Sequence, residues 1–505
     1  MAEPEPHSSP AFSESKEHKL VFLFCSLAAV HVFIFSAAFP FFNAVDEWAH
    51  FDLVVKYSQG QLPRPQVKVS AESASYLVIF NTQEYLLPTN NFSAILNPPQ
   101  WTRPAEKVAP VVSRQEMAWR LETNFETSQP PLYYLVAGLW WRLAKACGLH
   151  DGPLLYSLRF LNCFFVAALV WLAFVAARLV FPSQRFLRLG VPALLAFMPQ
   201  TAFYSIQNDV LSPVCFGVVF ICLIYWLRAG VPSVRLGVAT GLALAATFLT
   251  NLSSLPLLAV SGMVVLFQIR RWVKAGKWRV ALPAIRALAW CAGLPMIAWL
   301  GWCEHAFGDF TGTAAKIRFL GWTYKPFSQW WHHPIFSVQG LWTFISGLLA
   351  TFWQGEFLWH RVPLAWPAVN MVYALLSVGF VGIAVLCLLP RFSAGAQPQR
   401  QVLWLSFGCF IAGVVFLGLL SIIYDFGDCF YPSRAHPYFT SGRLTLGALT
   451  PFLLLYVYGL DRLLNRTKLQ WAKPLALTAL ILFMLISEIA IDWRIFQNPY
   501  NWFHM

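Results

Sequence analysis

The sequence predicts an all-α polytopic membrane protein, on the strength of its composition, its apolar runs and the placement of its charges. Of the 505 residues, 58% are hydrophobic and only 12% are charged, with a mean hydropathy of +0.55. This composition is far from that of a soluble domain. Apolar runs recur along nearly the whole chain, many close to the roughly 20 residues that a helix needs to cross a bilayer. The net charge of +13 is placed in the loops between these runs, so we expect no nucleic-acid partner.

Apolar stretches of spanning length predict about eleven transmembrane helices. Lys and Arg collect in alternate connections, for example "RRWVKAGKWR" (270–279) and "RLLNRTKLQWAK" (462–473). Cytoplasmic loops are rich in these residues, so we expect a cytoplasmic N-terminus and an extracytoplasmic C-terminus. The expected spans are 20–42, 157–180, 189–206, 210–228, 235–250, 255–269, 285–303, 369–390, 402–424, 445–461 and 472–492.

The polar stretches predict how the chain is divided. Residues 1–19 are rich in Pro and Ser and are expected to form a disordered cytoplasmic tail, followed by a single transmembrane domain over residues 20–505. Within that domain, "PLYYLVAGLWWRLAKACGL" (131–149) is apolar, but counting it as a crossing would put the later basic loops on alternating sides. We therefore expect an interfacial helix there, and another at "LWTFISGLLATFW" (341–353). Three extracytoplasmic segments are expected, over 43–156, 304–365 and 425–443.

An acidic stretch, "DEWAHF" (46–51), follows the first apolar run directly. On a helix Asp46 and His50 are four residues apart and share a face, and Glu47 is three residues from His50. A carboxylate beside a histidine suits proton abstraction from an alcohol, or metal coordination. A solvated loop at the membrane surface is the alternative explanation of the same residues, and position alone does not separate the two.

The order of these segments resembles the GT-C fold of polyprenyl-phosphate-sugar-dependent glycosyltransferases, which include protein O-mannosyltransferases and the lipid A aminoarabinose transferase. It is also similar to a bacterial family of uncharacterised membrane proteins with an Asp-Glu-x-x-His motif at this place. The resemblance lies in a first spanning helix, then "DEWAHF", a long outer loop and "ETSQPPLYYLVAGLWW". Further matches are "AFMPQTAFYSIQNDVL" (196–211), "GLALAATFLTNLSSL" (241–255) and "YFTSGRLTLGALTPFLLL" (438–455).

The resemblance implies an inverting glycosyltransferase acting at the extracytoplasmic face. Asp46 matches the acid expected to act as general base or to contact a metal, with Glu47 and His50 beside it, and Asp209 with Asn208 matches a second acid at the next outer turn. The leaving phosphate needs cationic partners, for which Arg443, Arg434 and His436 are the candidates. No cofactor is certain, and a divalent cation, Mg²⁺ or Mn²⁺, held by Asp46 and Asp209 is a possibility that the resemblance leaves open.

The expected partners are a polyprenyl-phosphate sugar, an acceptor on a glycan, a lipid or a protein, and membrane lipids. A bacterial plasma membrane is the expected location, because the nearer resemblance is bacterial. Phosphate-binding glycine loops of the Walker and Rossmann kinds are absent from the sequence, which disfavours a nucleotide-sugar donor. A transporter or flippase of lipid-linked sugars, a polymerase or ligase of lipid-linked glycans, and a non-catalytic relative stay open. A near absence of charged residues inside the predicted spans argues against the transporter.

Overall fold

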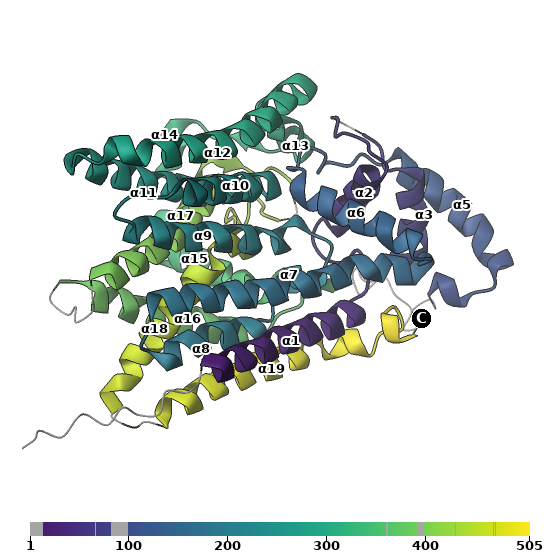
Figure 1. The fold of residues 1–505 in the computed structure, drawn as a ribbon. Coiled ribbons are helices and arrows are strands. Elements are labelled where there is room, and N and C mark those ends of the chain that lie inside the picture. The colour runs from purple at the N-terminus through teal and green to yellow at the C-terminus, as the bar shows by residue number, and fades with distance from the viewer. Residues whose placement is uncertain are drawn as a thin grey trace, which may run out of the picture.

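A computed structural model describes residues 14–65, 67–81, 99–359, 362–390, 397–429, 431–467, 469 and 471–504. Long helices form one bundle, and shorter helices gather in a lobe at one of its ends, which we call the lobe end (Figure 1). Because α1 begins at Glu14, its first turns fall within the predicted tail, and residues 1–13 lie outside the described residues.

Nine helices among the described residues are long and apolar enough to cross a membrane. These helices indicate an integral membrane protein. These candidate spans are Ser15–Ala38, Asp151–Val180, Asn208–Arg228, Leu252–Lys274, Trp278–Phe307, Pro367–Leu388, Gln397–Ile423, Gly442–Leu464 and Ala472–Phe496. The other two predicted spans correspond to the shorter helices α8 (Arg185–Ala196) and α10 (Val234–Thr250), which pack in the same bundle (Figure 1).

The helices of the bundle come from along most of the chain. In chain order they are α1 (Glu14–Ala38), α7 (Asp151–Val180), α8, α9 (Ser212–Arg228), α10, α11 (Leu255–Lys274), α12 (Trp278–Phe307), α16 (Pro367–Leu388), α17 (Gln397–Ile423), α18 (Leu449–Leu464) and α19 (Ala472–Phe496). Many that are consecutive in the bundle pack on each other, such as α1 with α7 and α9 with α10. Short 3-10 helices connect or extend them: η3 (Thr201–Tyr204), η4 (Asn208–Val210), η5 (Leu252–Ser254), η7 (Gly442–Ala448), η8 (Asn465–Thr467) and η9 (Trp502–His504).

The lobe follows α1 and is built from α2 (Glu47–Ser58), α3 (Ala71–Phe80), η2 (Gln100–Thr102), α5 (Ala105–Leu121) and α6 (Leu132–Ala146) (Figure 1). Helix α6 covers much of the stretch predicted as interfacial. One of its faces buries Tyr134 and Trp141 against the lobe, while Leu135, Leu139 and Leu143 are exposed at intervals of four residues. Such an exposed apolar stripe is typical of a helix that lies along a membrane surface.

The segment between α12 and α16 contains α13 (Thr313–Phe319), α14 (Phe327–Trp330), η6 (Pro334–Phe336) and α15 (Val338–Gln354). Two short antiparallel pairs stabilise it. Strand β1 (Thr323–Tyr324) pairs with β4 (Tyr424–Asp425), and β2 (Leu358–Trp359) pairs with β3 (Val362–Pro363). Helix α15 packs on α16 and η7 and buries Phe344, Leu348 and Phe352, so this helix, which the sequence predicts to be interfacial, is part of the bundle's packing.

Residues 437–443, which we call the strap, run along α15 toward its C-terminal end. The amide of Gly442 donates to Thr351 Oγ1 at 2.8 Å, and Thr351 Oγ1 in turn donates to the carbonyl of Thr440. A Cβ at Gly442 would lie 2.3 Å from the backbone nitrogen of Phe352, so only glycine allows this approach. The strap thereby fixes where the next residue, Arg443, enters the bundle.

Candidate active site

Asp46 stands at the turn that leads from α1 into α2. It is the N-cap residue of α2, with a backbone φ of 64° in the left-handed region, which residues other than glycine adopt sparingly. Its carbonyl accepts hydrogen bonds from the amides of Ala49 and His50. Its side chain makes no capping hydrogen bond, so the carboxylate is available for other contacts. Backbone positions of this kind concentrate at functional sites.

Three carboxylates from distant parts of the chain converge on the guanidinium of Arg443 in η7. Nη1 donates to Asp209 Oδ2 at 2.7 Å, Nε donates to Glu356 Oε2 at 2.9 Å, and Nη2 donates to Asp46 Oδ2 at 3.2 Å. Nη1 also reaches Oε1 of Gln207 at 3.2 Å. We call Asp46, Asp209, Glu356 and Arg443 the acid–arginine cluster. It unites two of the predicted acid positions with the predicted arginine.

The three acids of the cluster differ in burial and in the number of hydrogen bonds that they accept. The Asp209 side chain is 1% exposed, and its second oxygen accepts from Asn251 Nδ2 at 2.6 Å. The Glu356 side chain is 10% exposed, and its second oxygen accepts from Ser441 Oγ at 2.8 Å. The Asp46 side chain is 24% exposed and is held, within the described part of the chain, by the 3.2 Å contact with Arg443 alone. Asp46 is therefore the acid of the cluster that a ligand can reach.

A second charged pair, Glu126 with Lys316, acts on Asp46 electrostatically. Glu126 is buried, forms an ion pair with Lys316, and accepts from Gln129 Nε2 at 2.7 Å. Burial alone would raise the pKa of Glu126, but the ammonium of Lys316 lowers this pKa to about 2, so the carboxylate stays ionised. Burial also raises the pKa of Asp46, and the charge of Glu126 raises it further against the opposing effects of Lys316 and Arg443. A raised pKa suits a carboxylate that accepts a proton near neutral pH.

Glu47, the neighbour of Asp46, points to a different arginine. Its two oxygens accept from Nε and Nη2 of Arg159 at 2.9 and 2.8 Å, and also from the amides of Phe42 and Ile206. Both side chains are at most 1% exposed. Arg159 also donates to the carbonyls of Ser36, Phe39 and Pro40. All the hydrogen-bonding capacity of Glu47 is thus used in joining α2 to α7, and we leave Glu47 out of the reacting groups.

His50 and Asn208 border the cluster. Nδ1 of His50 hydrogen-bonds with the hydroxyl of Tyr134 at 2.6 Å. Burial lowers the pKa of His50 to about 3, so its ring is neutral. Asn208 donates to the carbonyl of Thr250 at 2.9 Å and to Gln129 Oε1 at 3.1 Å. Gln129 also donates to Glu126. Asn208, the chain neighbour of Asp209, therefore connects the Glu126–Lys316 pair to the acid–arginine cluster, and we regard it as a positioning residue.

Arg434 and His436, the other predicted phosphate ligands, lie apart from Arg443. Nε of Arg434 donates to Asp425 Oδ1 at 3.1 Å and to Oδ2 at 3.3 Å, and its side chain is exposed. His436 is also exposed, and its Nδ1 contacts the carbonyl of Ala435. The grouping of these two residues with Arg443 was based on closeness in sequence, and the strap separates them in space.

The predicted use of Asp46 and Asp209 as metal ligands does not fit their arrangement. No group of three or more His, Cys, Asp or Glu residues suited to a metal ion occurs among the described residues. The guanidinium of Arg443 occupies the position between the two carboxylates and bonds to both. A cation would therefore have to compete with an arginine that is already present, and we derive no step through a metal.

Sequence reasoning missed several members of the two networks. Glu356 lies 310 residues from Asp46, and no local pattern links them. Arg159 had a usable signal, because an arginine inside a predicted span calls for an acidic partner. The expectation that the spans nearly lack charged residues is also wrong. Within them His31 Nε2 pairs with Glu488 Oε2 at 2.8 Å, Tyr204 donates to Glu488 Oε1, and Asp492 is buried one turn further along α19.

Comparisons with known proteins give a family and a set of distant structural likenesses. The family model described as "Predicted membrane protein (DUF2142)" matches residues 30–426. No curated protein matches the chain.

Among solved structures, the chain is similar to the oligosaccharyltransferase AglB of Archaeoglobus fulgidus in complex with an inhibitory peptide and a dolichol-phosphate, with 11% identity, 96% of this chain covered and a TM-score of 0.39. The apo form of the oligosaccharyltransferase from the same organism gives 11% identity, 97% coverage and a TM-score of 0.41. Its complex with zinc and sulfate gives 9%, 93% and 0.35. The chain spans 52–56% of the length of the chains in these three structures. Likeness at this level assigns no function, which has to be argued from the chain's own residues.

Proposed function

The chain belongs to the DUF2142 family of predicted membrane proteins, and from its acid–arginine cluster we propose that it is an integral-membrane glycosyltransferase. The proposed donor is a polyprenyl-phosphate sugar, and the proposed acceptor is a hydroxyl group of a glycan, a lipid or a protein. Transfer would take place at the lobe end, on the extracytoplasmic side of a bacterial plasma membrane. The order of motifs that resembles the GT-C enzymes supports this reading, and so does the bundle of apolar helices that would surround a lipid donor.

The observation that carries the proposal is the contrast within the cluster. Asp209 and Glu356 have both oxygens bonded and are almost fully buried, whereas Asp46 is partly exposed and accepts through one oxygen only. Burial, followed by the charge of Glu126, also raises the pKa of Asp46. A general base must be reachable and must have a pKa closer to neutrality than an ordinary carboxylate. Asp46 meets both requirements, and the other two acids hold the arginine against which Asp46 is placed.

The proposed reaction is a single displacement at the anomeric carbon. The acceptor oxygen forms a bond to this carbon, and the bond from the carbon to the phosphate oxygen breaks, with its electron pair remaining on the leaving prenyl phosphate. The acceptor's proton moves to the carboxylate of Asp46. Attack from the face opposite the phosphate inverts the configuration of the sugar. Proton transfer to a positioned side chain of this kind contributes about 10²–10⁴-fold to rate.

The same proton transfer would make Arg443 available to the leaving phosphate. While Asp46 is ionised, it accepts a charge-assisted hydrogen bond from Nη2 of Arg443. When Asp46 becomes protonated, this attraction weakens, and Nη2 is released as negative charge grows on the leaving phosphate. Stabilising that charge lowers the barrier. Lys316, whose side chain is 26% exposed, is the second cation near the cluster.

The test is complementation of a deletion strain with variants of Asp46. Surface glycans of the strain, analysed by mass spectrometry, are expected to lack one sugar that the parental gene restores. Asp46→Asn should lower transfer at least 100-fold, because an amide cannot accept the proton. Asp151→Asn, which changes an exposed acid at the start of α7, is the matched control and should restore the sugar. Full restoration by Asp46→Asn at parental protein levels would overturn the general-base role, and unchanged glycans in the deletion strain would overturn the activity.

One observation favours a second candidate, a flippase of lipid-linked sugars. His31, Glu488 and Asp492 are titratable groups inside the bundle, where such groups often mark transport pathways. Reconstituted vesicles separate the two activities. A transferase releases free prenyl phosphate in proportion to the sugar transferred, whereas a flippase moves the intact donor and releases none.

A further inference from the structure

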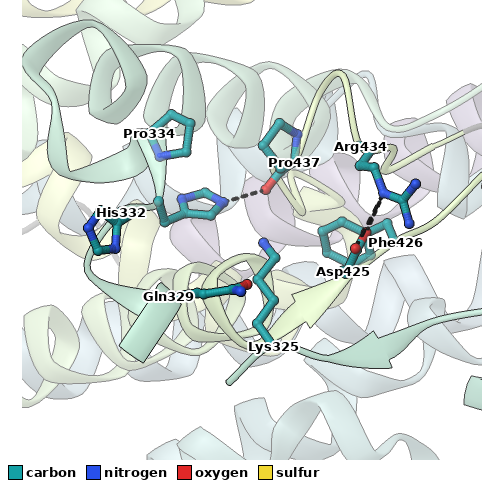
Figure 2. A pocket seen from close by; sticks show the side chains of 9 residues that line it. Lys325, Gln329, His332, Pro334, Asp425, Phe426, Arg434 and Pro437 are labelled. Atoms are coloured by element: carbon teal, nitrogen blue, oxygen red, sulfur yellow. Dashed lines mark hydrogen bonds and ion pairs between the residues drawn. The ribbon is translucent and has the colours of Figure 1, made fainter. Parts of the chain in front are cut away.

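A pocket of about 350 Å³ opens at a distance from the acid–arginine cluster, where β1, η6 and the loop after β4 meet. Figure 2 shows its polar side chains, with Lys325 reaching into the space bounded by Pro437 and Asp425. The volume is at the lower end of the roughly 300–1,000 Å³ that small-molecule pockets occupy. Its lining residues are Lys325, Gln329, His332, His333, Pro334, Asp425, Phe426, Arg434 and Pro437. We call it the β4-loop pocket.

The donors of this pocket are only partly used. The backbone amide of Lys325 donates to the carbonyl of Ile423 at 2.8 Å and anchors the residue, but its ammonium has no hydrogen bond or ion pair among the described residues. Only Nε of Arg434 donates to Asp425, and the two terminal nitrogens of Arg434 have no hydrogen bond among the described residues. Asp425 is the one acid among the lining residues, and Asp428 adds a second negative charge near Arg434. The Lys325 ammonium is therefore the cation of the pocket that lacks a bonded counterion in the described part of the chain.

His333 is a structural member of the wall. Its Nε2 donates to the carbonyl of Pro437 at 3.0 Å, and its Nδ1 accepts from the amide of Ile335 at 3.1 Å. Both ring nitrogens are therefore occupied, and the ring is neutral. His332 is exposed beside it. Burial lowers the pKa of the Lys325 ammonium, and the nearby Asp425 only partly offsets this, as expected of a cation that lacks a close counterion.

The surroundings of the pocket are apolar and exposed. Five large hydrophobic side chains flank it in sequence and are each more than half exposed: Tyr324, Phe327, Trp331, Phe336 and Val338. The pocket also begins where the spanning helix α17 ends at Ile423. Exposed aromatic residues at the end of a spanning helix are typical of the level at which lipid headgroups lie.

We propose that the β4-loop pocket binds the phosphate of a membrane lipid headgroup, through Lys325 and the free nitrogens of Arg434. A phosphate at the membrane surface needs cationic hydrogen-bond donors, and basic pockets between helix ends bind such headgroups. The exposed aromatic side chains would contact the acyl or prenyl chains below. This site shares no residue with the acid–arginine cluster and does not depend on the proposed transfer reaction.

The test measures binding of three phosphates to the purified full-length protein in a zwitterionic detergent. The probes are dioctanoyl phosphatidylglycerol, farnesyl phosphate and inorganic phosphate, followed by the fluorescence of the tryptophans near the pocket. Either or both lipids should bind, with inorganic phosphate at least tenfold weaker. Lys325→Met should weaken lipid binding about tenfold, because it removes one charge-assisted hydrogen bond. Lys325→Arg should retain binding.

Arg64→Gln, which removes an exposed cation of the lobe, away from the pocket, is the matched control and should leave binding unchanged. The elution volume and the melting temperature of each variant show whether it is folded. Equal binding of inorganic phosphate would replace the lipid with a small soluble anion and overturn the proposal. Unchanged lipid binding by folded Lys325→Met would overturn it as well.

Discussion

Asp46 and Glu47 are neighbours in the chain, yet they bind different arginines. We call Arg159 with Glu47 the first centre, and Arg443 with its three acids the second centre. Glu47 meets Arg159 with two parallel hydrogen bonds in a fully buried site, where one acid faces one base and every donor and acceptor is matched. Asp46 meets Arg443 through one longer bond in a site where three acids face one base. The first centre is balanced and the second has an excess of acid.

This difference indicates that the Glu47–Arg159 pair is structural, whereas Asp46 can take part in a reaction. A balanced buried pair gains nothing by exchanging a proton, because every charge has its partner. Burial, and after it the charges of Glu126 and Glu356, raise the pKa of Asp46, and Asp46 is also the most exposed of the three acids. The change in helix direction at residue 46 gives the two adjacent side chains these opposite roles.

The largest expected effect comes from breaking the balanced centre. Glu47→Gln leaves Arg159 buried without its counterion, and loss of one partner of a buried ion pair typically costs about 3–5 kcal/mol. Asp46→Asn, at a partly exposed site with one long bond, should change the free energy of unfolding by less than about 1 kcal/mol. Thermal unfolding in detergent measures both. Equal melting temperatures for the two variants would show that the centres do not differ as described.

An intermediate effect is expected from the strap that positions Arg443. Gly442→Ala places a Cβ 2.3 Å from the backbone nitrogen of Phe352, so the strap must move away from α15. Overpacking of this kind costs about 1–3 kcal/mol, and the displaced guanidinium should lower sugar transfer further than the lost stability explains. Gly408→Ala, where a Cβ meets nothing within 4 Å, is the control. Parental transfer by Gly442→Ala would show that the position of Arg443 is not critical.

The smallest effect is a pair of opposite shifts in pH dependence. Transfer requires ionised Asp46, so the rate should fall as pH decreases through the raised pKa of this residue. Glu126→Gln removes a negative charge that raises that pKa, so the acid limb of kcat/KM against pH should move to lower pH. Lys316→Met removes a positive charge that lowers it, and the limb should move to higher pH. Shifts of the same sign in both variants would contradict the electrostatic link to Asp46.

The sequence predicted the helical bundle well, because apolar runs of spanning length have few other stable solutions. The structure confirms the predicted association of Asp46 and Asp209 with Arg443, and the role of Asp46 as a base stays a prediction. The sequence did not predict that Glu47 is structural, because adjacent residues share a motif but a left-handed turn sends them to different partners. Glu356 and Lys316 were beyond reach, since they approach Asp46 only through tertiary packing. Arg434 and His436 were grouped with Arg443 by proximity in the chain, which a strap running along a helix does not preserve.

The strap limits how many residues the chain can have between Pro437 and Arg443. Pro437 lines the β4-loop pocket and Arg443 completes the acid–arginine cluster, and six peptide units in contact with α15 join them. One inserted or deleted residue would displace the guanidinium by about 3 Å along an extended chain, which is as long as the hydrogen bonds that define its position. Side chains along this stretch are free to vary wherever they face outward, but the number of residues between its two ends is fixed.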